Sequence, residues 1–433
     1  MAATSATVHP GDSTKVYQPG GLQAYYALFL LCLAFFFDYA DRFILSSLLP
    51  FIKADWGLSD QALGLLTGVL SIPMAVLVIP LSVVVDRWSR RKMLALMVAI
   101  WSLATLACAF TRNFSQLLIA RAFTGVGEAG YAPASIATIG AAFQQEARGR
   151  ATGVWDAFAP LGSAVGFLLG GYIGLKYGWR HAFGLVALPG VFLAIAFMFM
   201  RDYKTVPLDD NAASARAKGA FKKASAELFS IPSLIFVWIG FTLNFAVNTP
   251  VMVWLPSYLH RFHGMDEQRA GTMAGVLALM ALLGAPLGGI LADRWMKKSI
   301  DARMKLSGLT SIGSAVLLIS ALLLAHTPLF QPLIVGFGIL SVAFLAPAAA
   351  VIQDVVHPGL RAVAYGINVF CLQLFGASWT PWLVGRMSDT FGLERALMIT
   401  PLFALAAGVV FLLGSRHYEP DLARVKQVVL LEE

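Results

Sequence analysis

Residues 82–92 read SVVVDRWSRRK, and residues 289–298 read GILADRWMKK. The two stretches share the tripeptide Asp-Arg-Trp, and they stand about half of the chain apart. Each follows one long apolar segment and precedes another. A membrane protein that repeats one half of itself is typical of transporters, in which two equivalent halves rock around a site between them.

The composition places the chain in a membrane. Of its 433 residues, 58% are hydrophobic and only 13% are charged. A soluble protein of this size needs a far more polar surface. Apolar stretches of about 20 residues, each long enough to cross a bilayer as a helix, recur along the chain. They predict twelve membrane-spanning helices, at residues 24–51, 61–85, 91–111, 114–143, 149–175, 180–201, 231–260, 268–295, 303–325, 329–356, 361–387 and 394–416.

The expected fold is therefore an all-α membrane protein of two pseudo-symmetric six-helix bundles, at residues 21–201 and 231–416. The polar segment 202–230 is the expected linker, and 1–20 and 417–433 are the expected tails. Most Lys and Arg residues fall on the side of the tails and linker. This positive-inside pattern predicts that both termini are cytoplasmic, in a bacterial inner membrane or a plasma membrane. The net charge of +8 is explained by this topology, so no nucleic-acid partner is expected.

The repeat resembles the major facilitator superfamily over about residues 20–416. Its two Asp-Arg stretches match the signature loop G-x-x-x-D-R-x-G-R-R between spans two and three and its echo between spans eight and nine, although Ser82 replaces the signature Gly. The stretches GVGEAG (125–130), WLPSYL (254–259) and SDTFG (388–392) resemble the Spinster-like branch. The Asp-Arg of span one and the Arg…Glu of span four are shared with organic-anion:proton symporters of the same superfamily.

Two spans contain charges that an apolar helix does not need. Asp38, Asp41 and Arg42 lie in span one, and Arg121 and Glu128 lie in span four. Charges inside a membrane are costly and usually mark a functional site. At about 1.5 Å per residue, Asp38 and Glu128 fall near the midplane, whereas Asp41, Arg42 and Arg121 fall in an outer layer.

These charges suggest how a proton and an anion are coupled. A carboxylate stays ionised beside an arginine, and it takes a proton when an anionic substrate draws the arginine away. Arg42, Arg121 and Asp38 are expected at the substrate, and the resemblance to the symporters implies that Asp41 and Glu128 bind the proton. The alternative is a static buried ion-pair network that fixes helix packing.

Other polar and aromatic residues near the midplane are candidates to line the substrate cavity. Each has the alternative role of packing or bonding between helices. They are Tyr39, Tyr131, Asn244, Asn248, Asn368, Gln373 and Trp379.

The repeated loops also predict a gate. Asp86 and Asp293 are expected at the cytoplasmic surface, near the N-termini of spans eleven and five, which attract carboxylates. A latch there would close the cytoplasmic side and release as the halves rock, unless the loops serve only as topology anchors. Its basic members are expected to be Arg87, Arg90, Arg91, Arg150 and Arg294.

Span five carries glycines at intervals of four residues, at positions 162, 166, 170 and 174. Such a stripe of small residues lets a second helix backbone approach closely, and span eight is the expected partner.

No nucleotide-binding loop, His/Cys metal cluster or Ser/His/Asp arrangement is recognisable. Neither an enzyme nor a cofactor is expected, apart from protons as the coupling ion. The expected function is proton-coupled transport of an organic anion, or of an amphipathic anionic molecule, by a monomer surrounded by membrane lipids. Two alternatives remain: an exporter of lipids or hydrophobic drugs by proton antiport, and a non-transporting receptor or scaffold.

Overall fold

The computed structural model describes residues 20–202, 227–357 and 360–424, without the side chains of residues 82, 83, 85–87, 145, 146 and 362. These ranges fold into helices joined by short turns and contain no strand. The predicted N-terminal tail and most of the linker lie outside them. The last helix reaches Arg424, so it extends into the predicted C-terminal tail, whose remainder also lies outside.

The helices of the N-terminal half are α1 (Gly21–Trp56), α2 (Asp60–Gly68), α3 (Ser71–Arg87), α4 (Arg90–Cys108), α5 (Phe114–Ala129), α6 (Tyr131–Ala142), α7 (Gln145–Tyr177) and α8 (Trp179–Phe197). Those of the C-terminal half are α10 (Pro232–His263), α11 (Glu267–Leu279), α12 (Ala281–Met296), α13 (Ala302–Leu323), α14 (Phe330–Leu340), α15 (Leu345–Val355), α16 (Arg361–Cys371), the π-helix η2 (Leu372–Ala377), α17 (Thr380–Phe391), α18 (Leu393–Leu397) and α19 (Thr400–Arg424).

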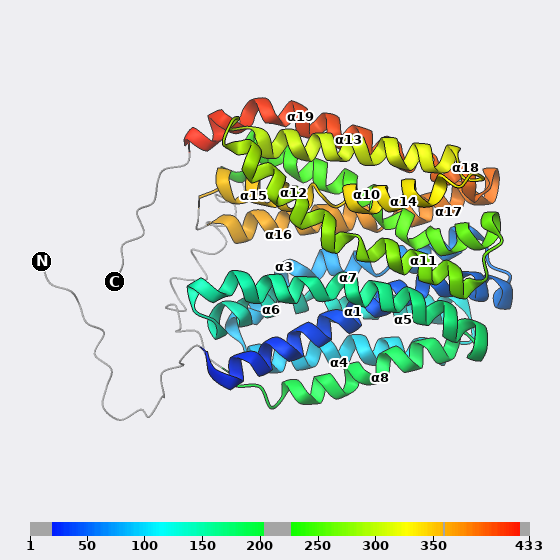
Figure 1. Cartoon of the computed structure of the whole chain (residues 1–433). Coiled ribbons are helices and arrows are strands. Elements are labelled where there is room, and N and C mark those ends of the chain that lie inside the picture. Colours follow the sequence, from blue (N-terminus) through cyan, green and yellow to red (C-terminus); the bar gives the residue numbers. More distant parts are fainter. Residues whose placement is uncertain (1–19, 203–226, 358–359, 425–433) are drawn as a thin grey trace, which may run out of the picture.

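Consecutive helices join into rods of membrane length, such as α2–α3 and α11–α12. Within the described ranges, ten such rods or single helices are long and apolar enough to cross a membrane. The α1 helix and the α5–α6 pair complete the twelve predicted spans, and these two carry the buried charges. Figure 1 shows the two halves stacked on each other, with α1 beginning and α19 ending at the same end of the molecule. We call this the terminal end, and the opposite one the far end. The predicted all-α fold is confirmed.

The glycine stripe of α7 packs against α1. A Cβ atom on Gly166 would lie only 2.4 Å from the carbonyl oxygen of Ala40, so a side chain there would overlap the α1 backbone. The predicted close approach is present, but its expected partner, span eight, was wrong for this stripe. A neighbouring face of α7, which includes Gly171, packs against span eight, where a Cβ atom on Gly171 would lie 2.3 Å from the carbonyl oxygen of Glu267 in α11.

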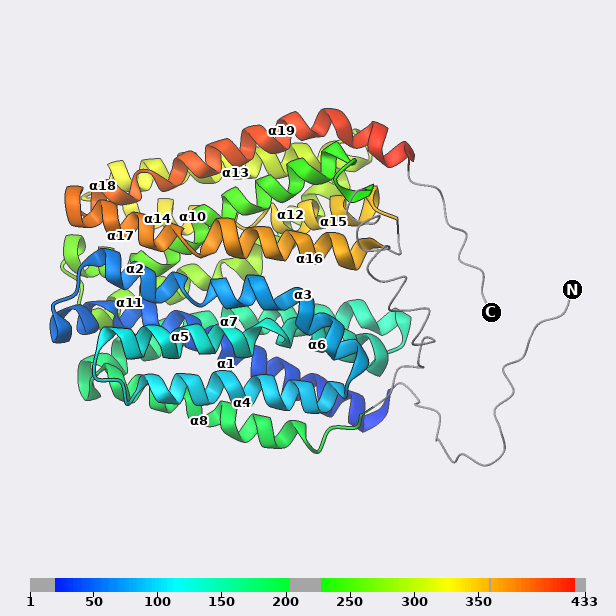
Figure 2. The ribbon, with the colours of Figure 1, turned by 180° about the vertical axis from the view of Figure 1, so that it is seen from behind.

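The two halves touch through backbone at the far end. A Cβ atom on Gly64 of α2 would lie 2.2 Å from the carbonyl oxygen of Pro381 in α17, and one on Gly271 of α11 would lie 2.4 Å from that of Phe167 in α7. Figure 2 shows α2 and α17 side by side near this end. The far end is therefore closed in this conformation.

Candidate ion-coupling site and gates

Two helices of the N-terminal half bring five charged side chains together. Asp38 and Arg42 stand one turn apart on α1, and Arg121 and Glu128 stand two turns apart on α5. Each spacing places both residues on one face of its helix. Asp41, next to Arg42 in sequence, points to a different side of α1, which lets the two neighbours meet different partners.

The five residues form two ion-paired groups. Arg121 Nη1 donates to Asp41 Oδ2 at 3.0 Å. Arg42 Nη2 lies 2.7 Å from Glu128 Oε2, and Arg42 Nε lies 3.3 Å from Asp38 Oδ1. Depth alone placed Arg42 in the outer layer, and that placement was wrong for its charge. Helical side chains lean toward the N-terminus of their helix, so the guanidinium reaches back to both midplane carboxylates.

Burial makes the charge balance of this site important. Asp38, Asp41, Arg121 and Glu128 are at most 3% exposed, whereas the Arg42 side chain is 20% exposed. Three carboxylates share two guanidinium groups, so full ionisation would leave one uncompensated negative charge in a low-dielectric interior, which is costly. One bound proton would neutralise the group.

Two of the carboxylates also have free acceptor atoms. Asp41 Oδ1 and Glu128 Oε1 are buried without a hydrogen-bond partner. Each of these oxygens can accept a proton without first breaking a hydrogen bond.

The aromatic candidates of this half differ in role. The guanidinium of Arg42 lies 5.0 Å from the centre of the Tyr39 ring, in cation–π contact. Tyr131 is fully buried, donates to the carbonyl of Leu31 and accepts from Trp155. Tyr39 thus belongs to the site, and Tyr131 packs the helices around it.

Three C-terminal candidates are engaged within their own half. Asn244 Nδ2 donates to Ser311 Oγ at 3.1 Å, and Asn248 Nδ2 donates to the carbonyl of Ser341 at 3.2 Å. Trp379 Nε1 donates to a carbonyl one turn earlier on its own rod. These contacts correspond to the bonding role that the sequence left open.

Asn368 and Gln373 retain polar groups for another partner. Asn368 is 1% exposed, and neither its Oδ1 nor its Nδ2 has a hydrogen-bond partner. Gln373 reaches across to the other half, where its Nε2 lies 3.7 Å from Met74 Sδ. Asn248 Oδ1 is likewise buried without a hydrogen-bond partner, so these three C-terminal candidates keep polar atoms that a ligand could contact.

At the terminal end, Asp293 is bound within its own half. It accepts from Arg303 Nη2 at 3.1 Å, and Arg303 also pairs with Asp354, which accepts from Tyr418 at 2.5 Å. Asp293 therefore does not connect the two halves in this conformation, because its ion-pair partner Arg303 lies on the next helix of the same half. The latch predicted on Asp293 is not in its closed form.

The other predicted latch residues vary in exposure. Arg150 and Arg294 are exposed, Arg91 is half-buried, and Arg90 is buried in the first turn of α4. The side chains of Asp86 and Arg87 lie outside the described part of the chain.

A charged gate that the sequence did not reveal closes the far end. Asp60 of α2 accepts from Arg261 of α10 at 2.6 and 2.8 Å, from Lys53 at 2.6 Å and from Ser388 of α17 at 2.5 Å. Asp389 of α17 accepts from the backbone N–H groups of residues 60 and 61, both at 2.8 Å. We call Lys53, Asp60, Arg261, Ser388 and Asp389 the far-end gate.

The stretch 388–392, which contains Ser388 and Asp389, stood out in the sequence only for its family resemblance. No gate was predicted there. Among the described residues, no group of three or more His, Cys, Asp or Glu side chains is arranged to hold a metal ion.

Comparison with known proteins places this geometry in context. A family model described as Major Facilitator Superfamily matches residues 31–381. An "MFS-type efflux pump" of Mycolicibacterium smegmatis is 29% identical over 98% of this chain and 99% of its own length. An Escherichia coli protein named "Probable L-galactonate transporter" is 28% identical over 89% of this chain and 87% of its own.

A solved structure shares the fold. It is a bacterial homolog of the human lysosomal transporter Spinster in an inward-facing and unoccupied conformation, with a TM-score of 0.80 and 22% identity. The match covers 93% of this chain and 99% of that one.

Proposed function

Because this chain belongs to the Major Facilitator Superfamily, whose members are secondary transporters and not enzymes, we propose that it couples proton movement to the transport of an organic anion. The observation that carries this proposal is the shortage of cations in the buried site. Three carboxylates share the guanidinium groups of Arg42 and Arg121. A proton is the missing positive charge.

Arg42 is the residue proposed to meet the anion. Its side chain is 20% exposed, whereas that of Arg121 is 1% exposed and engaged with Asp41. Arg42 is therefore accessible, and Arg121 serves to hold Asp41. The expectation that both arginines contact substrate is narrowed to Arg42.

The coupling step follows from the partners of Arg42. An anion that binds its guanidinium competes with Asp38 and Glu128, because all three need the same N–H donors. Glu128 is buried and has Arg42 as its ion-pair partner. A buried carboxylate without a cation is stable only when it is protonated. Anion binding would therefore favour proton uptake by Glu128.

The proposed orientation places the terminal end in the cytoplasm of a cell whose inner or plasma membrane holds the protein. The support is the concentration of Lys and Arg in the tails, the linker and the loops of that side, which follows the positive-inside pattern. With the far end closed, this conformation is then inward-facing. A cysteine at position 210 should react with an impermeant maleimide only in opened cells. Labelling in intact cells would reverse the orientation.

Two further parts of the proposal concern the substrate and the assembly. The galactonate in the name of the E. coli relative is a carboxylate, which supports an anionic substrate. The five charged residues come from one chain, so a monomer suffices.

An exporter of lipids or hydrophobic drugs by proton antiport is the second candidate, and the name of the M. smegmatis relative favours it. It would use the same proton site with the opposite direction of substrate movement. The family favours transport over a receptor or scaffold.

The test uses the purified protein in liposomes that contain a pH-sensitive dye. A panel of organic anions is added outside, without any imposed pH gradient. A transported anion should acidify the lumen if it enters together with protons. Alkalinisation during uptake would indicate antiport. Uptake of labelled anion without any pH change would refute proton coupling.

A further inference from the structure

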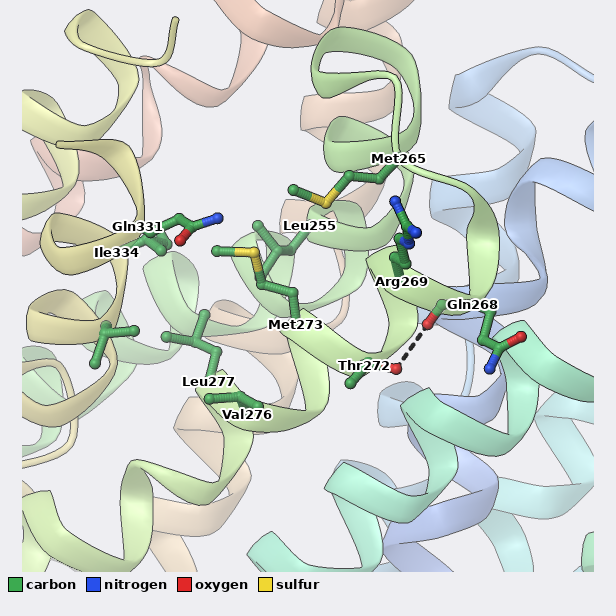
Figure 3. A pocket seen from close by; sticks show the side chains of 11 residues that line it. Leu255, Met265, Gln268, Arg269, Thr272, Met273, Val276, Leu277, Gln331 and Ile334 are labelled. Carbon is green, nitrogen blue, oxygen red and sulfur yellow. Dashed lines mark hydrogen bonds between the residues drawn. The ribbon is translucent and has the colours of Figure 1, made fainter. Parts of the chain in front are cut away.

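A pocket opens on the side of the C-terminal half, away from the charged site. It has a volume of about 490 Å³ and lies between α10, α11 and α14 (Figure 3). Most of its wall is apolar and is made by Leu255, Met273, Val276, Leu277, Ile334 and Val335. Val276 is 44% exposed, and Leu283, Leu287 and Ile290 farther along the same membrane-length rod are also exposed. We infer from this apolar outer face that the pocket opens toward lipid.

The depth of the pocket matches one leaflet of a bilayer. Arg269 and Gln331 lie in the first turns of α11 and α14, both of which begin at the far end. Leu277 lies eight residues beyond Arg269, which is about 12 Å along the helix. One leaflet contributes about 15 Å of the hydrocarbon thickness. The pocket thus runs from the membrane surface through most of one leaflet.

Figure 3 shows the side chains of Met265, Met273 and Leu255 converging in this gap, with Gln331 entering from the other wall. Methionine side chains are flexible and polarisable, so they adapt to ligands of irregular shape. The interior therefore suits a flexible alkyl chain better than a rigid polar solute.

The rim carries two opposite charges. Arg269 lines the pocket and is 81% exposed, and Asp266 beside it is 47% exposed, with their ionic atoms 3.4 Å apart. Asp266 Oδ1 accepts from the backbone N–H of Arg269 at 2.7 Å and caps α11, and only Oδ2 pairs with the guanidinium. Because exposed pairs of this kind contribute little to stability, a ligand can replace the pair at the guanidinium and at Oδ2. A phosphate suits the Arg269 guanidinium, and an ammonium suits the Asp266 carboxylate.

We propose that this pocket binds one phospholipid of the phosphoethanolamine class from the leaflet at the far end. One acyl chain occupies the apolar cleft between α11 and α14. The phosphate accepts hydrogen bonds from Arg269, and the ammonium donates to Asp266. The negative phosphate of the headgroup thus faces the positive guanidinium, and its positive ammonium faces the negative carboxylate.

The test is native mass spectrometry of the purified full-length protein with added phosphatidylethanolamine, phosphatidylglycerol or an alkane. We expect one tightly bound phosphatidylethanolamine, weaker phosphatidylglycerol, which lacks the ammonium, and no retained alkane. Val276→Trp should reduce the binding of phosphatidylethanolamine at least tenfold, because the indole would fill the cleft. Val335→Trp, on the opposite wall, should do the same if the first variant does not fold.

Matched controls separate the pocket from the general lipid surface. Val316 of α13 is also an exposed valine, at 52%, and does not line the pocket, so Val316→Trp should leave binding unchanged. Arg269→Gln should weaken binding about tenfold, the scale of one lost charge-assisted hydrogen bond. Arg395→Gln, an exposed arginine at the same end, should have no effect. Equal binding of phosphatidylglycerol, or equal effects of the pocket variants and their controls, would overturn the proposal.

Discussion

Arg42 and Arg121 carry the same charge in the same half, but their surroundings give them different tasks. Arg121 is almost completely buried and is held by Asp41, whereas Arg42 is partly exposed and contacts two carboxylates. If one member of a buried ion pair is removed, the charge of the other member stays buried without compensation. An accessible arginine that shares its donors can release one of them to a ligand.

This difference predicts that Arg121 is mainly a stabilising residue. Arg121→Gln should destabilise the protein by about 3–5 kcal/mol, because Asp41 remains buried without its cation. The double variant with Asp41→Asn should recover much of that loss, since both charges are then gone. Thermal unfolding of both variants in detergent measures the effect. A single variant as stable as the native chain would show that water, and not Arg121, compensates Asp41.

Glu128→Gln should separate proton coupling from substrate movement. The amide mimics the protonated acid, so the variant should still bind substrate and exchange it down a gradient. It should lose accumulation driven by a pH gradient, because no proton can leave position 128. Both activities are measured in the same liposomes, and Glu227→Gln, outside the membrane-spanning helices, is the control. Retention of both activities would place the proton elsewhere, and loss of both with misfolding would favour a static ion-pair network.

The members of the site could be predicted from the sequence, but their pairing could not. Ionisable residues stand out in apolar segments, which is why Asp38, Asp41 and Glu128 were found. Counting residues along a helix gives the depth of a Cα atom. It does not give the reach of a side chain, and the long Arg42 side chain returns a full turn to Asp38.

At the scale of elements, α1 is positioned by α7. The glycine stripe of α7 lets the α1 backbone approach, and α1 carries Asp38, Asp41 and Arg42. The glycine spacing predicted a close helix contact. It could not predict which helix makes the contact, because a face of small residues allows the backbone of any neighbouring helix to approach. The geometry of the charged site therefore depends on glycines that bear no charge.

Gly166→Val should disrupt this packing. Its added atoms would overlap the backbone at Ala40, where a Cβ alone would lie 2.4 Å from the carbonyl oxygen. We expect a loss of at least about 3 kcal/mol in stability, at the upper end for overpacking. Gly153→Val is a matched control on the same helix, because nothing lies within 4 Å of its Cβ position. Size-exclusion profiles and melting temperatures of the two variants should differ clearly, and equal behaviour would mean that α1 can shift at no cost.

At the scale of the whole molecule, the two halves and their helices were predictable because length, apolarity and repetition are properties of the chain. The conformation was not. Asp60 and Arg261 stand at helix ends in different halves, so no spacing within either half connects them. The sequence shows two loops that resemble a terminal-end latch, and the structure has the opposite end closed.

The far-end gate should therefore control which side is open. Asp60→Asn removes the charge that binds Arg261 and Lys53, and should shift the equilibrium by about 2 kcal/mol, or roughly 30-fold, toward opening at the far end. Spin labels on a cysteine-free background measure this shift. The distance between positions 112 and 395, one in each half at the far end, should increase. The distance between positions 150 and 294 at the terminal end should decrease.

The two distances together distinguish a gate from a local stabilising contact. Rocking of rigid halves around a central site must lengthen one distance while it shortens the other. Asp55→Asn, which removes an exposed carboxylate paired with Arg180 within the N-terminal half at the same end, should change neither. If Asp60→Asn lengthened the far-end distance alone, the halves would not move as rigid bodies. If it changed neither distance, backbone contacts such as that of Gly64 with Pro381 would be sufficient to close the far end without the charges.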